Sequence, residues 1–300
     1  MAVTTETWTV LRMILWSAEY LAGKGVERAR LDAEHLLAHA LGLKRLDLYL
    51  QHDRPLEPAE LDTFRPMLKR RAAREPLQYV LGHQPFRELD LAVDRRVLIP
   101  RPETEVLVGA VLEWAAGRAD LDALDVGTGS GAIALSLATE GPFGRVIATD
   151  VSGAALEVAA ANRAATGLDE RVELRQGEDF GCIREDERFD VIVSNPPYVA
   201  QPEAEGLEPE VVAWEPAEAL FAGPDGLDVI RRLIDGAPGH LREGGLLALE
   251  VGADQPEAVA GLLTQRGAFE EVAVKADLTG RGRVVLATRR AEARTDRKEA

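Results

Sequence analysis

The fold of this 300-residue chain follows from one stretch, LDALDVGTGSGAIALSLATE at residues 121–140. Its apolar start, residues 121–126, predicts a strand, and residues 131–140 predict a helix. Gly127, Gly129 and Gly131 lie between the two, where a residue without Cβ lets the backbone turn tightly and approach a ligand. A strand, a glycine-rich turn and a helix in this order are typical of an α/β fold that binds a nucleoside.

Strands and helices continue to alternate after this stretch. Further strands are predicted at 145–150, 171–175, 189–194 and 245–251, and helices at 152–166, 226–238 and 255–266. Two closing strands, at 269–275 and 283–288, have only a turn between them, so they must pair antiparallel, because a parallel crossover needs about a dozen residues. The alternation predicts an α/β fold with a seven-stranded, doubly wound, Rossmann-like sheet whose last strand is antiparallel.

Residues 1–82 differ from the rest and predict a small helical bundle. Leu11, Leu15 and Leu21 repeat at helical spacing, and Pro58 opens another helix at a first-turn position where its missing N–H costs nothing. The predicted organisation is a substrate-recognition bundle at 1–82, a hairpin linker at 83–102, a catalytic domain at 103–289 and a polar tail at 290–300.

Composition disfavours several classes of protein. The formal net charge of −16 is unusual for a protein that grips nucleic acid over a broad surface, so no direct nucleic-acid partner is expected. No apolar run approaches the roughly 18 residues of a membrane span, so no membrane partner is expected either. The single cysteine, Cys182, suits a reducing, cytoplasmic location. His35 and His39 lack a third ligand, so no metal site is predicted.

Two basic clusters interrupt this acidic composition. One lies at residues 69–74 and contains Lys69, Arg70, Arg71 and Arg74, and the other lies at residues 95–101. Each cluster is either a solvated face or a binding surface, and the sequence leaves both interpretations open.

Asp150 ends the strand that follows the glycine-rich turn. A carboxylate at the end of that strand can accept hydrogen bonds from both hydroxyls of a ribose. The turn and Asp150 together satisfy a relaxed dinucleotide-binding pattern, but S-adenosylmethionine presents the same ribose as NAD. At this point a nucleoside ligand is predicted and its identity stays open.

The tetrapeptide NPPY, residues 195–198, decides between these ligands. It follows an apolar strand, at the carboxyl end of the sheet where doubly wound folds bind ligands. Pro196 and Pro197 make the loop stiff. An amide nitrogen is a poor nucleophile because its lone pair is delocalised, and acceptors for both of its N–H groups turn that lone pair towards an electrophile. The side-chain oxygen of Asn195 and the carbonyl of Pro196 are suitable acceptors, and Tyr198 is expected to stack on the planar group.

These residues predict an S-adenosylmethionine-dependent N-methyltransferase that acts on a planar nitrogen. One alternative is a nucleic-acid methyltransferase that modifies adenine N6 or guanine N2, which predicts a basic recognition domain. A dinucleotide-dependent oxidoreductase is a second alternative, but it gives NPPY no purpose. A non-catalytic interaction module on the same scaffold is a third, and intact Asp150 and Asn195 argue against it.

Several longer segments resemble the release factor glutamine methyltransferases. They are DVGTGSGAIALSLA, NPPY, EPAEALFAGPDGL, RRAAREPLQYVLGHQPF at residues 70–86 and VLIPRPETE at residues 97–105. NPPY alone is shared with nucleic-acid methyltransferases, whereas the last two segments are more specific. The resemblance runs from about residue 70 to residue 283, with Ala222 before Gly223 where many members have two glycines. It implies a class I methyltransferase fold and methylation, by S-adenosylmethionine, of the side-chain amide N5 in the GGQ motif of class I peptide chain release factors, which act in translation termination.

The resemblance also implies roles for single residues. The glycine-rich turn would wrap the methionine and ribose of the cofactor, and Phe180 would pack near the adenine. Glu250 and Gln255 would be structural, while Glu103 and Glu105 either contact the substrate or cap a helix. The implied cofactor residues are Gly127, Thr128, Gly129, Ser130, Gly131, Asp150, Phe180 and Asn195. The implied catalytic and substrate-binding residues are Asn195, Pro196, Pro197 and Tyr198.

Overall fold

The structure is a computed structural model that describes residues 8–291. It divides into two compact units. The first contains Met1–His83 and Glu208–Trp214, and the second contains Gln84–Leu207 and Glu215–Ala300. Most of the polar tail expected at 290–300 lies outside the described residues.

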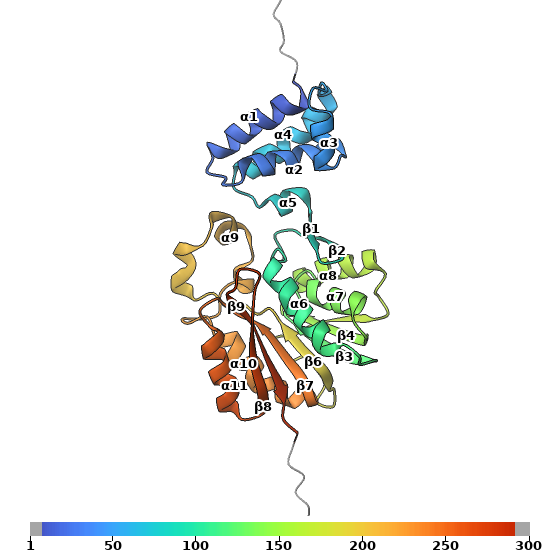
Figure 1. Ribbon diagram of the computed structural model, residues 1–300, viewed down its shortest axis with the longest axis vertical. Helices are drawn as coiled ribbons and strands as arrows, with labels where there is room; N and C mark the ends of the chain where they lie inside the picture. The colour runs from blue at the N-terminus through green and yellow to red at the C-terminus, as the bar shows by residue number, and fades with distance from the viewer. Residues whose placement is uncertain (1–7, 292–300) are drawn as a thin grey trace, which may run out of the picture. The chain divides into compact units, whose positions relative to one another are not determined.

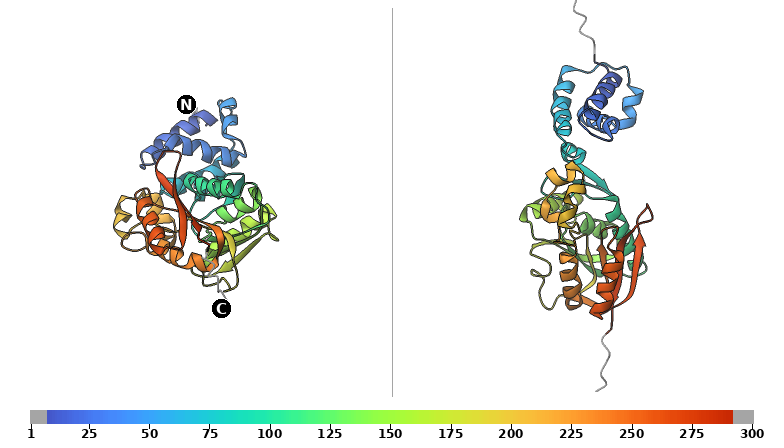
Figure 2. Two further views of the ribbon diagram at one scale, coloured as in Figure 1. Left: turned by 60° about the horizontal axis from the view of Figure 1, so that its bottom comes forward. Right: turned by 90° about the vertical axis from the view of Figure 1, so that its left-hand side faces the viewer.

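The first unit is a helical bundle, as expected from its apolar spacing (Figure 1, Figure 2). Thr9 accepts a hydrogen bond at the start of the first helix, Gly42 ends the second in the left-handed conformation, and Pro58 opens the fourth. Its buried core includes Leu21, Leu36, Leu37, Leu48 and Phe64. The helices are α1 (Val10–Ala22), α2 (Ala29–Leu41), α3 (Arg45–Leu50), α4 (Pro58–Ala72), α5 (Leu77–Leu81) and α9 (Pro209–Trp214).

The apolar pattern of α1 is wider than the face that the helix buries. Val10, Met13 and Ile14 are buried, whereas Leu15 and Trp16 are 50% and 46% exposed. Exposed apolar side chains therefore remain on this helix after the bundle core has formed.

Helix α9 is held in the bundle by ion pairs. Glu210 accepts hydrogen bonds from Arg71 Nη2 at 3.0 Å and from Arg74 Nε at 2.7 Å, and Arg71 Nε also donates to Asp32 at 2.7 Å. The cluster at residues 69–74 is therefore not a uniformly solvated or open basic face, because two of its arginines are neutralised inside the bundle. Arg70, exposed beside them, pairs with Glu75.

The second unit is built on a seven-stranded sheet of order β5-β4-β3-β6-β7-β9-β8. The first five of these strands are parallel, and β9 is antiparallel to both of its neighbours, as predicted. A separate two-stranded sheet joins β1 (His83–Phe86) and β2 (Leu89–Ala92), at the expected hairpin. The large sheet contains β3 (Leu121–Val126), β4 (Phe143–Asp150), β5 (Val172–Gln176), β6 (Phe189–Ser194), β7 (Leu241–Glu250), β8 (Phe269–Ala276) and β9 (Gly282–Arg289).

Helices cover both faces of this sheet (Figure 1). Side chains alternate along β3, so Ala123 packs with the cluster that includes α6 and α7, and Leu124 packs with the cluster that includes α10 and α11. In the described chain no helix is long and apolar enough to cross a membrane. The helices of this unit are α6 (Pro102–Ala115), α7 (Ala132–Glu140), α8 (Gly153–Thr166), α10 (Asp228–His240) and α11 (Pro256–Arg266), with short 3-10 helices at Gln201–Gly206 and Ala217–Ala219.

The order of the central strands positions a ligand site. From β3 the chain proceeds outward through β4 to β5, and then crosses to β6 on the other side of β3. The carboxyl ends of β4, β3 and β6 are therefore neighbours at the point where the strand order reverses, which is where open α/β sheets bind ligands. In register, Asp125 of β3 lies opposite Ala148 of β4 and Val193 of β6.

Candidate active site

A cavity of about 440 Å³ lies at these carboxyl ends, within the second unit. Its size is in the range of small-molecule sites. It brings together the glycine-rich turn after β3, Asp150 after β4 and Asn195 after β6, which the sequence had predicted to share one site. Further walls come from residues 96–100 and from the segment 216–223.

The glycine-rich turn needs glycine for its backbone conformation. Gly127, Gly129 and Gly131 have φ values of 76°, 55° and 86°, in the left-handed region. A Cβ built on Gly127 or Gly129 would have no neighbour within 4 Å. At these two positions the backbone, rather than a side chain, therefore faces open space, and a ligand can approach it closely.

Asp125 stabilises the glycine-rich turn through hydrogen bonds. The sequence analysis assigned it no role. Its Oδ2 accepts hydrogen bonds from Thr128 Oγ1 at 2.6 Å and from the Ala134 N–H at 3.2 Å. The side chain is fully buried, and burial raises its pKa to about 7. An acid at the end of a strand before a glycine-rich turn is the sequence signal that could have identified it.

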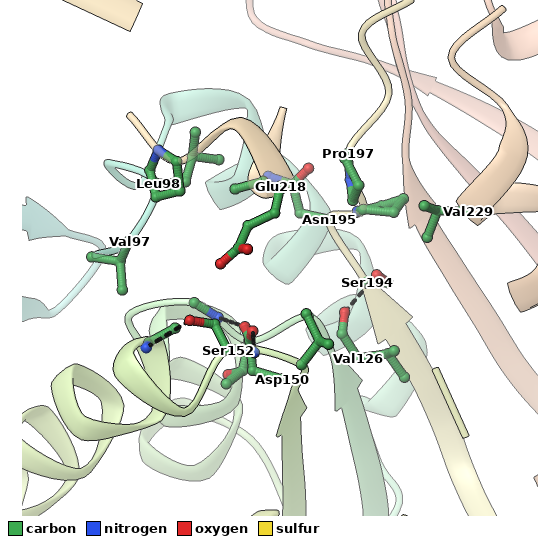
Figure 3. A pocket seen from close by; sticks show the side chains of 18 of the residues that line it. Val97, Leu98, Val126, Asp150, Ser152, Ser194, Asn195, Pro197, Glu218 and Val229 are labelled. Atoms are coloured by element: carbon green, nitrogen blue, oxygen red, sulfur yellow. Dashed lines mark hydrogen bonds between the residues drawn. The ribbon is translucent and has the colours of Figure 1, made fainter. Parts of the chain in front are cut away.

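Asp150 is oriented by the same turn. Its Oδ2 accepts from the Gly129 N–H and its Oδ1 from the Ser152 N–H, each at 2.9 Å. Each oxygen keeps a second lone pair with which to accept from a ligand. Burial raises the Asp150 pKa, and the Glu218 carboxylate, which points towards Asp150 across the cavity, raises it further (Figure 3).

The NPPY loop is fixed at both of its ends. Asn195 Nδ2 donates to Thr104 Oγ1 at 3.0 Å, and Gln255 Nε2 donates to the Tyr198 carbonyl at 2.9 Å. Gly226 passes so close that a Cβ there would collide with the same Tyr198 carbonyl. Gln255, expected to be structural, therefore acts on the loop itself.

Two aromatic residues do not lie where the sequence analysis expected. The Phe180 ring stacks on His240 with 5.2 Å between centroids and packs over Gly236, and Phe180 is not among the residues that line the cavity. Tyr198 also lies outside the lining and packs against the buried cluster that includes α10 and α11, and burial raises its pKa to about 12. Side chains of loop residues turn towards available core space, which periodicity does not reveal.

The cavity is also lined by side chains to which the sequence analysis assigned no role. Val151, directly after Asp150, is 54% exposed. Phe221, which follows the NPPY loop in the sequence, is an aromatic residue that lines the cavity. Thr104 also lines the cavity and belongs to the VLIPRPETE segment. Because that segment is specific to the family that the sequence resembles, it could have identified Thr104 as a site residue. Among residues 8–291 no group of three His, Cys, Asp or Glu side chains could hold a metal ion.

Family models match two parts of the chain. The PrmC N-terminal domain matches residues 12–82, and the methyltransferase small domain matches residues 104–213. Among solved structures, the hMettl16 catalytic domain in complex with MAT2A 3'UTR hairpin 6 has a TM-score of 0.55 at 20% identity, covering 75% of this chain and 81% of its own. A 16S rRNA methyltransferase of T. thermophilus in complex with AdoMet and guanosine has a TM-score of 0.50 at 22% identity, covering 69% of this chain and 50% of its own. At identities this low, the similarity shows only that the folds are alike.

Sequence relatives cover almost the whole chain. The release factor glutamine methyltransferase of Geobacter sulfurreducens is 45% identical over 93% of this chain and 96% of its own length. The enzyme of the same name from Moorella thermoacetica is 49% identical over 91% of this chain and 95% of its own. The chain belongs to the release factor glutamine methyltransferase family.

Proposed function

We propose that this S-adenosylmethionine-dependent methyltransferase methylates the side-chain amide N5 of the glutamine in the GGQ motif of class I peptide chain release factors. The observation that carries the proposal is the convergence of Asp150 and Asn195 on one cavity, one suited to a ribose and the other to an amide. Family membership supports the substrate class. Because release factors act on ribosomes, the reaction would take place in the cytoplasm.

The residues at the cavity fit the cofactor. Gly127 and Gly129 leave open space over their backbone, and Asp150 offers two oriented acceptors to the ribose hydroxyls. Val151 offers an exposed apolar side chain against a flat ring, which is the role we propose in place of Phe180. When bound, S-adenosylmethionine supplies an electrophilic methyl group.

The NPPY loop supplies the acceptors at the other end of the cavity. Asn195 Oδ1 and the Pro196 carbonyl would each accept one N–H of the glutamine amide, which aims the nitrogen lone pair across the cavity. Such positioning of two reactants can account for about 7–11 kcal/mol of a barrier. Since the methylated nitrogen loses its proton readily, the residues need to position the amide and exclude water, without a strong base.

We propose that the helical unit binds the release factor. Apolar side chains remain exposed on two of its helices, and such patches mark protein-binding surfaces. They are Leu11, Leu15 and Trp16 on α1 and Leu46, Tyr49 and Leu50 on α3.

The proposal is tested by incubating a release factor with the protein and S-adenosylmethionine, followed by intact-mass and peptide mass spectrometry. One added methyl group on the GGQ glutamine is expected, and none on a release factor with alanine at that position. Asn195→Ala should lower kcat by roughly 10²–10³-fold, as for loss of one preorganised polar group at a reacting centre. Methylation of RNA or DNA in place of the release factor would favour a nucleic-acid methyltransferase.

The binding surface is tested separately with Trp16→Ser and Leu50→Ser. Both should raise KM for the release factor several-fold while kcat and cofactor affinity stay near normal. Leu278→Ser is the control, because Leu278 is equally apolar and 91% exposed but belongs to the second unit. An unchanged KM in both bundle variants would refute the surface.

A further inference from the structure

Two consecutive hydrogen bonds link the Asn195 amide to a buried carboxylate. Asn195 Nδ2 donates to Thr104 Oγ1 at 3.0 Å, and Thr104 Oγ1 donates to Glu250 Oε2 at 2.7 Å. Thr104 and Glu250 are 4% and 1% exposed, so water does not compete for these bonds. The three residues come from the end of β6, the first turn of α6 and the end of β7.

When Glu250 is ionised, the chemistry of the three groups fixes the direction of both bonds. An ionised carboxylate only accepts, so the single hydroxyl proton of Thr104 is used on Glu250. The Thr104 oxygen can then only accept from a third group, and the atom of Asn195 that faces it must be Nδ2. Glu250 Oε1 has no hydrogen-bond partner within the described residues, and Glu250 Oε2 accepts from the Thr104 hydroxyl.

The orientation of the Asn195 amide matters because its two ends have opposite hydrogen-bonding character. With Nδ2 on Thr104, Oδ1 is left as an acceptor. A flipped amide would present an NH₂ group to the N–H groups of the substrate, and two donors cannot form a hydrogen bond.

We propose that Thr104 is a positioning residue that makes Asn195 present its oxygen to the substrate amide, with Glu250 fixing the direction of the Thr104 hydroxyl. The inference rests on the proposed function, because it concerns the acceptor for the glutamine nitrogen. It gives Glu250 a role in the active site, where the sequence analysis expected a structural one.

The central test compares Thr104→Val with Thr104→Ser. Valine keeps the shape of threonine but loses the hydroxyl, so kcat should fall by roughly 5- to 30-fold, the effect of one net hydrogen bond. Serine keeps the hydroxyl and should retain most of the wild-type kcat. Thr149→Val is the matched control, since Thr149 is fully buried in β4 and its hydroxyl donates to the Asp125 carbonyl.

Three further measurements separate positioning from a loss of structure. Affinity for S-adenosylmethionine and KM for the release factor should each change little in Thr104→Val, and circular dichroism should show the wild-type fold, although the unfolding midpoint falls because Glu250 loses its hydroxyl donor. The double variant Thr104→Val/Asn195→Ala should be no slower than Asn195→Ala alone, because Thr104 acts only through Asn195.

Glu250→Gln tests the carboxylate. Glutamine has a similar volume but adds an N–H donor, so its amide can reverse the hydroxyl of Thr104, and kcat should fall about 2- to 10-fold. In a Thr104→Val background the same substitution should have no further effect. Assays are run at pH 8, because burial raises the Glu250 pKa to about 7 and the wild-type carboxylate is mostly ionised there.

The outcomes distinguish this inference from the proposed function. If Asn195→Ala is slow but Thr104→Val keeps the wild-type kcat, the positioning role is wrong and the proposed function stands. If Asn195→Ala, folded and able to bind cofactor, is as fast as wild type, the proposed site fails. Equal losses in Thr104→Ser and Thr104→Val, or additive losses in the double variant, overturn the positioning role. An unchanged kcat in Glu250→Gln removes Glu250 from it.

Discussion

Asp150 stabilises the fold, and in the proposed function the same residue also binds the ligand. Its two oxygens anchor the N–H groups of Gly129 and Ser152, so the carboxylate orients itself through the turn that it also stabilises. In the proposed function, the remaining lone pairs accept from the ribose hydroxyls. A site prepared in this way loses little entropy when a ligand binds.

Asp150→Ala should therefore weaken S-adenosylmethionine binding by roughly 10- to 150-fold, the effect of losing charged hydrogen bonds worth about 1.5–3 kcal/mol. Titration calorimetry measures the affinity. Asp190→Ala is the control, because Asp190 lies at the other end of β6, where it pairs with Arg242. An Asp150→Ala affinity equal to that of the control would exclude Asp150 from the cofactor site.

The elements that set up this site could largely be read from the sequence. The periodic strands and helices of the second unit, the antiparallel closing strand and the carboxyl-end location of Asp150 and Asn195 all follow from apolar spacing and chain topology. Short helices such as α3, α5 and α9 were not predicted, because a run of five or six residues carries too little periodicity.

The side chains that complete the site were less predictable. Phe180 and Tyr198 were assigned to the ligand from their place in the sequence, yet both rings pack against protein. Thr104 and Glu250 are 146 residues apart, and only the assembled sheet brings them into contact. Local patterns identify which loops meet at a site, but not which way each side chain points.

Gly226 tests how rigidly the elements hold the NPPY loop. Gly226→Ala adds a Cβ that collides with the Tyr198 carbonyl, at a φ of 72°. Gly244→Ala is the matched control, because its φ is 71° but nothing lies within 4 Å of the added Cβ. Both variants should lose about 1–2 kcal/mol of unfolding free energy through left-handed strain. Only Gly226→Ala should also lower kcat, by at least roughly tenfold.

Chemical unfolding and single-turnover methylation measure the two effects of this substitution. Equal kcat values for Gly226→Ala and Gly244→Ala would show that the loop adapts to the displaced carbonyl.

At the scale of the whole molecule, the chain passes between the two units more than once. It leaves the second unit after Leu207 and returns at Glu215, and the intervening helix α9 belongs to the bundle. Burial alone would raise the Glu210 pKa, but hydrogen bonds from Arg74 and Arg71 hold it below its usual value. Deleting residues 1–80 would remove those arginines, so point variants are a cleaner test of the bundle.

Glu210→Gln should destabilise the protein by about 2–4 kcal/mol, because it leaves buried Arg71 with only part of its countercharge. Asp62→Asn is the control. It breaks the exposed pair with Arg65 on the same bundle and should cost less than about 1 kcal/mol. Denaturant unfolding followed by circular dichroism compares the two, and similar losses would show that α9 is not anchored by this ion pair.

The two buried carboxyls near the site make stability depend on pH in an unusual direction. Burial raises the pKa of Asp125 and that of Glu250 to about 7, with Glu103 adding to the effect on Glu250 and Arg283 and Arg101 opposing it. Between about pH 4.5 and pH 7 the folded chain therefore binds protons that the unfolded chain releases. The resulting stability is fully present below the usual pKa values and is lost as the pH rises through about 7.

Glu250→Gln removes one of these carboxyls and should make the stability depend less strongly on pH. The difference between a pKa of about 7 and the usual 4.5 corresponds to about 3 kcal/mol, so the variant should be more stable than wild type at pH 8 by up to that amount. Near pH 4.5, where the wild-type Glu250 is neutral, the two should unfold at similar urea concentrations. Glu257→Gln, on the exposed face of α11, should follow the wild type at both pH values. A Glu250→Gln protein that is less stable than wild type at pH 8 would mean that the ionised carboxylate contributes more through Thr104 than its burial costs.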